Sequence, residues 1–66
     1  MKTFLLIYAF TFASGNTLEA EGITLRATPE MCERICVECQ SETQRELLHG
    51  NGVLQKVVVR CLEVRQ

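Results

Sequence analysis

The segment Met31–Cys39, MCERICVEC, holds three of the four cysteines of this 66-residue chain at the spacing C-x3-C-x2-C. On a helix, residues three and four apart are neighbours, so the cysteines at 32, 36 and 39 would share one face. Met31 and Ile35 extend that face, and charged residues occupy much of the remaining helix surface. The segment therefore predicts an amphipathic helix that turns its cysteines toward the core.

The helical pattern runs from residue 29 to about residue 48. Thr28 suits the N-cap, Pro29 the first helical position, and Glu30 brings an acid to the positive end of the helix dipole. Gly50 suits the position just after the helix. These signals predict a single central helix.

One strand is expected before this helix and one after it. Residues 23–27 alternate apolar and polar side chains, and residues 53–64 are rich in valine. The result is a small disulfide-stapled α+β fold, with its strands parallel if they share one sheet. The alternative is a shorter helix followed by a β-hairpin across Gly50–Gly52.

Residues 1–15 have the pattern of a secretory signal peptide. A basic Lys2 precedes the apolar run Phe4–Phe12, and Ala13–Gly15 provide small residues for cleavage. The run is too short for the roughly 20 residues that a membrane-spanning helix needs. We expect cleavage after Gly15, or alternatively after Ala20, and secretion of residues 16–66.

The secreted part is small and weakly acidic. Residues 16–66 contain six basic and eight acidic side chains, without a basic cluster, which argues against nucleic acid and anionic membranes as partners. A chain of this size builds too little core to be stable by burial alone, so a covalent staple is expected. The expected core residues are few: Ile23, Leu25, Met31, Ile35, Leu47, Val57 and Val59.

Disulfides are the expected role of the cysteines, because an even number in a short exported chain is typical of a disulfide framework. Zinc could use Cys32, Cys36 and Cys39 with Cys61 or His49, but the second ligand pair of a structural zinc site is missing. The C-x3-C-x2-C spacing resembles the cluster-binding loop of radical S-adenosylmethionine enzymes over eight residues only. Those enzymes build a large barrel around that loop, so we expect no metal and no cofactor.

Helix geometry restricts the pairing. Residues seven apart lie about 10.5 Å apart along a helix, beyond the roughly 7 Å that a disulfide spans, so Cys32–Cys39 is excluded. The first choice is Cys39–Cys61 with Cys32–Cys36, and the second is Cys32–Cys61 with Cys36–Cys39. A covalent homodimer is the third.

The layout of leader, short mature chain and even cysteine set resembles that of arthropod venom peptides, although the Cys-x-Cys pair of scorpion toxins and defensins is absent. This resemblance implies an extracellular peptide that modulates an ion channel or receptor of another organism. A hormone-like, reproductive or immune-induced peptide that binds a host receptor is the alternative. An enzyme is not expected, because residues 16–66 contain one histidine and no aspartate, tyrosine or tryptophan. The side chains that could face the target are Arg34, Arg45, Lys56 and Arg60.

Overall fold

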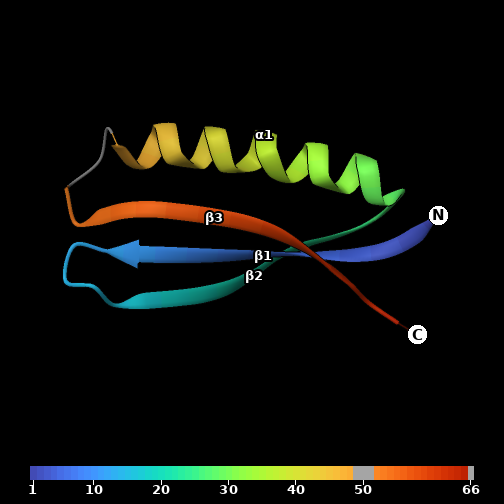
Figure 1. Cartoon of the computed structure of the whole chain (residues 1–66), viewed down its shortest axis with the longest axis horizontal. Helices are drawn as coiled ribbons and strands as arrows, with labels where there is room; N and C mark the ends of the chain where they lie inside the picture. The colour runs from blue at the N-terminus through green and yellow to red at the C-terminus, as the bar shows by residue number, and fades with distance from the viewer. Residues whose placement is uncertain (49–51, 66) are drawn as a thin grey trace.

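A three-stranded antiparallel sheet with one flanking helix makes up the chain in the computed structural model, which describes residues 1–48 and 52–65. The elements are, in chain order, β1 (Lys2–Phe12), β2 (Thr17–Ala27), α1 (Pro29–Leu48) and β3 (Leu54–Glu63). Strand β1 lies in the middle of the sheet, with β2 on one side and β3 on the other. Helix α1 runs beside β3 along the length of the molecule (Figure 1).

The expected α+β class and its helix are confirmed, and both expected strands are present with somewhat different ends. The strand expected at 23–27 is the end of the longer β2, and β3 begins and ends one residue inside the expected 53–64. Since β1 pairs antiparallel with both neighbours, β2 and β3 run in the same direction but do not touch as a pair. The alternative hairpin is not formed, because α1 continues to Leu48 and β3 pairs with β1. Residues 49–51, where its turn was expected, lie outside the described residues.

The strand that the sequence analysis did not predict is β1, which is formed by the apolar segment expected to be a signal peptide. In β1, Phe4 and Leu6 point toward the helix and are buried, while Ile7 is buried on the opposite face. A strand that is apolar on both faces is suited to the centre of a sheet. The same composition that is typical of an export signal therefore also makes a central strand.

Helix α1 begins with the cap that the sequence predicts. The backbone N–H of Met31 donates to the Thr28 hydroxyl oxygen at 3.2 Å, and the N–H of Cys32 donates to the Thr28 carbonyl at 3.0 Å. The first bond satisfies one of the donors that a helix start leaves without partners, and the second is the first regular backbone bond of the helix. Pro29 follows the cap as the first helical residue.

The core lies between α1, β1 and β3. It consists of Phe4, Leu6, Cys32, Cys36, Val57 and Val59. Of the expected core residues, Val57 and Val59 are buried, whereas Ile23 and Met31 are 62% and 44% exposed. For Ile23 the prediction was wrong because this residue lies on β2, which β1 separates from β3, whereas the core forms between α1, β1 and β3.

Two glutamines of α1 reach the free edge of β3. The side-chain oxygen Oε1 of Gln40 accepts a hydrogen bond from the Val59 N–H at 3.0 Å, and Oε1 of Gln44 accepts one from the Val57 N–H at 3.1 Å. The Gln44 amide also donates to the Gln55 carbonyl at 3.2 Å. The helix is thereby bonded to the edge of the sheet as well as packed against it.

Across residues 1–48 and 52–65, the structure contains no helix with the length and apolar character that a membrane span requires.

Candidate functional site

A disulfide joins the first turns of α1 to the end of β3. Cys32 and Cys61 are bonded across 29 positions of sequence, and their Cα atoms are 6.3 Å apart. Cys61 points toward the helix because it lies on the same face of β3 as the buried Val57 and Val59, four and two residues before it. The Cys32 side chain is fully buried.

This bond corrects the first-ranked pairing, in which Cys61 was joined to Cys39. Strand β3 runs back along α1 (Figure 1). The later part of β3 therefore meets the start of the helix, and Cys61 bonds Cys32 there. The second-ranked pairing had this bond, but its other half, Cys36–Cys39, is not formed, and neither is the Cys32–Cys36 bond of the first. Cys36 and Cys39 are thiols. Both lie on a continuous helix, where side chains splay outward and are poorly aimed at each other.

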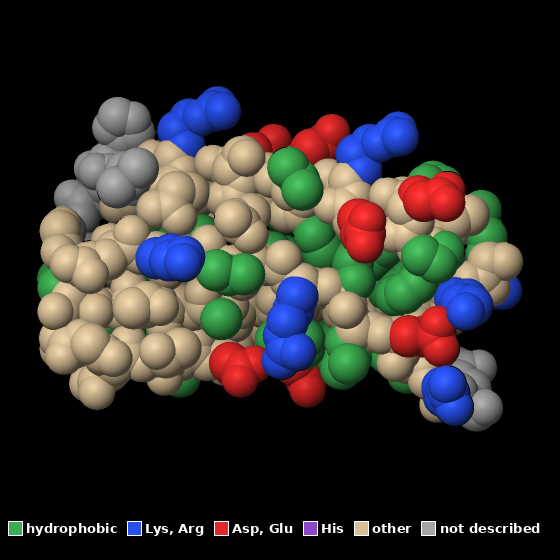
Figure 2. Space-filling model, in the orientation of Figure 1, with side chains coloured by type: hydrophobic (Ala, Val, Ile, Leu, Met, Phe, Trp, Pro, Cys, Tyr) green, Lys and Arg blue, Asp and Glu red, His purple; other side chains and the backbone are tan. Residues whose placement is uncertain are grey.

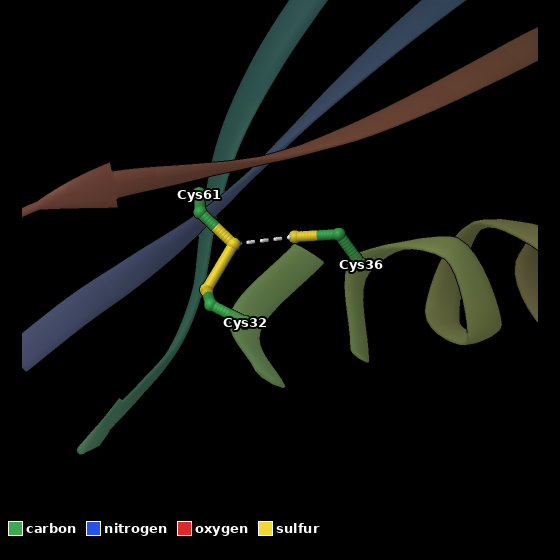
Figure 3. A group of neighbouring side chains, drawn as sticks. All are labelled: Cys32, Cys36 and Cys61. Carbon is green, nitrogen blue, oxygen red and sulfur yellow. Dashed lines mark hydrogen bonds between the residues drawn. A yellow bond between two sulfur atoms is a disulfide. The ribbon is translucent and has the colours of Figure 1, made fainter. Parts of the chain in front are cut away.

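The Cys36 thiol lies against the disulfide. Its Sγ is 2.9 Å from the Sγ of Cys61, and Cys36 must donate in this contact because the disulfide sulfur carries no hydrogen. Figure 3 shows the Cys36 side chain pointing at Cys61 from the side away from Cys32. The three sulfur atoms all lie within 4.8 Å of one another.

Burial raises the pKa of the Cys36 thiol above its ordinary value of 9.0, and the nearby Cys39 and Glu33 raise it further. The cause is the cost of placing a thiolate in an apolar environment beside other negative charge. Tyr8, on β1, behaves similarly: desolvation first, and then the Cys39 side chain, raise its pKa above 10.0. Both groups therefore favour their neutral forms in the folded protein.

The sulfur cluster bears on the expectation of a metal-free protein. Cys32, Cys36 and Cys61 could offer three soft ligands, but two of them are joined in the disulfide. Thiolates bind metal, whereas a disulfide does not supply them. In the disulfide-bonded form, this cluster therefore offers the single thiol of Cys36. His49, the other zinc ligand considered, lies outside the described residues.

A groove of about 450 Å³ opens above the thiol, between α1 and β3. Its apolar lining includes Val37 and Val59, and charged or amide side chains stand beside them, a combination typical of binding sites. The lining residues are Glu33, Cys36, Val37, Gln40, Val59, Arg60 and Cys61. No pattern in the sequence predicts this groove, because helix and strand contribute to it from positions about twenty or more residues apart.

The four basic residues expected to face a target come from two elements. Arg34 and Arg45 are exposed on α1, and Lys56 and Arg60 are exposed on β3. Arg60 is the one that lines the groove, and it also pairs with Glu19 of β2 at 2.9 Å. Basic and acidic side chains are interspersed over the face in Figure 2.

Fold and site together define a small disulfide-stapled α+β protein with a thiol against its disulfide. Comparison with protein-family models, with curated proteins and with solved structures gave no match.

Proposed function

We propose that residues 16–66 act as an exported, disulfide-stapled peptide that binds an extracellular ion channel or receptor, in the manner of venom peptides. The observation that carries the proposal is the Cys32–Cys61 disulfide, which closes a long loop in a chain with a small core. Such bonds persist in oxidising compartments outside the cytosol. The leader pattern of residues 1–15 supports the same destination.

Export has a structural consequence, because cleavage after Gly15 removes the whole of β1. Within residues 1–48 and 52–65, β2 and β3 each pair with β1 and not with each other. Removal of β1 therefore removes the hydrogen-bonded partner strand of both. The disulfide and the hydrogen bonds from Gln40 and Gln44 join α1 to β3 without a residue of β1. We therefore propose that the α1–β3 pair is the binding unit of the exported peptide.

The groove between α1 and β3 is the proposed contact surface for the target. It belongs to both elements of the binding unit, and Val37 beside it is 66% exposed, which leaves apolar surface for a partner to cover. Arg60 contributes a cation to this groove, and Arg34 stands exposed on α1. Cleavage after Gly15 leaves Glu19 in the exported peptide, but it removes the β1 strand that holds β2 next to β3. Arg60 is then free for an acidic group of the target.

The proposal is tested by expressing the full precursor in secretory cells. The expected product is in the medium, begins at Asn16, and has an intact Cys32–Cys61 bond. It should bind saturably to membranes that carry the target class, and Arg60→Gln with Val37→Ser should weaken that binding at least tenfold. Arg65→Gln, outside the groove, is the matched control. An intracellular product that still begins at Met1 and has four free thiols would overturn the proposal.

A further inference from the structure

Cys36 stands where a nucleophile would stand to attack the disulfide. Its sulfur is 2.9 Å from the Cys61 sulfur and faces it from the side away from Cys32 (Figure 3). Thiol–disulfide exchange proceeds by attack of a thiolate on one sulfur while the other sulfur leaves, through an arrangement of three sulfurs. The cluster has the attacking, central and leaving atoms in that order.

We propose that Cys36 and the Cys32–Cys61 disulfide form a thiol–disulfide exchange site, in which the bond moves from Cys32 to Cys36 while Cys61 stays bonded. Cys36 gives up its proton to water in the groove, and its thiolate forms a bond to the Cys61 sulfur. The Cys32–Cys61 bond breaks, and its electron pair leaves on the Cys32 sulfur, which takes up a proton. One disulfide and one thiol are present before and after, so no oxidant or reductant is needed.

Helix geometry makes both isomers compatible with the fold. Cys32 and Cys36 are four residues apart on one face of α1, about 6 Å along the axis. Cys61 is close to both, so β3 remains stapled to the helix whichever cysteine holds it. The exchange therefore changes the position of the free thiol and keeps the covalent tie.

The two isomers differ in what the groove presents. In the Cys32–Cys61 isomer the thiol of Cys36 lines the groove. In the Cys36–Cys61 isomer that thiol is consumed, and the free thiol belongs to Cys32, which is fully buried. The exchange site thus decides whether the free thiol lies at the groove, on Cys36, or is fully buried, on Cys32. This inference goes beyond the proposed function, since it does not depend on export or on any target.

Disulfide mapping of the full-length chain tests the exchange. The Cys39→Ser variant, oxidised to one disulfide, is incubated at pH 8.5, quenched with acid at intervals, alkylated with N-ethylmaleimide and digested with trypsin. Arg34 separates the cysteines of interest, which fall on three tryptic peptides, residues 27–34, 35–45 and 61–65. Peptide 61–65 is expected to be linked first to 27–34 and then also to 35–45, at a constant final ratio. The rate should rise about tenfold per pH unit, because the thiolate is the nucleophile.

Two further variants make the outcome unambiguous. Full-length Cys36→Ser should keep only the 27–34 link at all times. Full-length Cys32→Ser, equilibrated in a glutathione redox buffer, should form Cys36–Cys61. The proposal is overturned if peptide 61–65 in the Cys39→Ser chain never links to 35–45, or if Cys32→Ser folds and leaves Cys36 and Cys61 as thiols. It is also overturned if peptide 61–65 in the Cys36→Ser chain becomes linked to 35–45, which would place the exchange at Cys39. Should Cys32→Ser fail to fold, the Cys39→Ser mapping still decides.

Discussion

Gln40 of α1 and Val59 of β3 are joined by a hydrogen bond of 3.0 Å from the strand backbone to the helix side chain. Gln44 repeats this contact at Val57. The repeat is possible because four helical residues rise about 6.0 Å and two strand residues about 6.6 Å. The two side chains occupy backbone donors that an edge strand would otherwise offer to another chain, a known route to aggregation. The contact therefore argues against a homodimer formed by pairing of β3 strands.

Replacing both glutamines by alanine should destabilise the full-length chain and expose the edge of β3. The loss should be about 1.5–4.5 kcal/mol for the pair, since the two side chains make three hydrogen bonds and each contributes about 0.5–1.5 kcal/mol. Urea unfolding measures the loss. Light scattering over a range of concentrations should show self-association of the variant and not of the wild type.

Glutamate variants provide the matched control. Gln40→Glu keeps an acceptor for the Val59 N–H and should change stability little near neutral pH. Gln44→Glu keeps the acceptor but loses the donor to the Gln55 carbonyl, so it should be the more destabilising of the two. Equal effects of the two glutamate variants would contradict the assigned bonds.

The disulfide should account for a large part of the stability. Cys61→Ala removes every covalent tie of β3, including the exchanged one, and should lower the free energy of unfolding by about 3–4 kcal/mol on the chain-entropy model for a loop of this length. Urea unfolding of oxidised wild type, reduced wild type and the variant measures this. Cys39→Ala, outside the bond, is the control and should lose far less. If oxidised and reduced wild type unfold at the same urea concentration, the bond does not staple the fold.

Alkaline pH should weaken the fold. The pKa values of Cys36 and Tyr8 are raised above their ordinary 9.0 and 10.0 by desolvation, so the folded chain holds protons that the unfolded chain releases. Stability from this source is complete below about pH 9 and is lost as pH rises through the raised values. The urea midpoint should therefore fall between pH 8 and pH 10.5. In Tyr8→Phe and in Cys36→Ala, the urea midpoint should fall less with pH than in the wild type, when each variant is compared with its own midpoint at pH 7. The same fall in both variants as in the wild type would contradict the raised pKa values of Tyr8 and Cys36.

Sequence reasoning found the helix because capping and periodicity are local: Thr28 and Pro29 mark its start without help from the rest of the chain. It found β3 from its valines. It did not anticipate the central strand, because the apolar pattern of 1–15 is typical both of a leader and of a buried strand. It also ranked the wrong partner for Cys61, since the choice between Cys32 and Cys39 depends on which end of β3 meets which turn of α1. Such positions are set by tertiary packing, not by spacing.

The contribution of β1 to the fold is tested by preparing residues 16–66 alone and oxidising them. Without β1, the ladder to both neighbouring strands is gone, so the strand signal in circular dichroism should fall sharply. The helix signal should persist in the oxidised peptide and decrease when the peptide is reduced. In the full chain, packing against Phe4 and Leu6 also stabilises the helix, whereas in the peptide this stabilisation depends on the Cys32–Cys61 bond. The full-length chain, reduced, is the control and should keep its helix better than the reduced peptide. A peptide with no helix even when oxidised would show that α1 depends on β1, and the α1–β3 pair would then not be an independent binding unit.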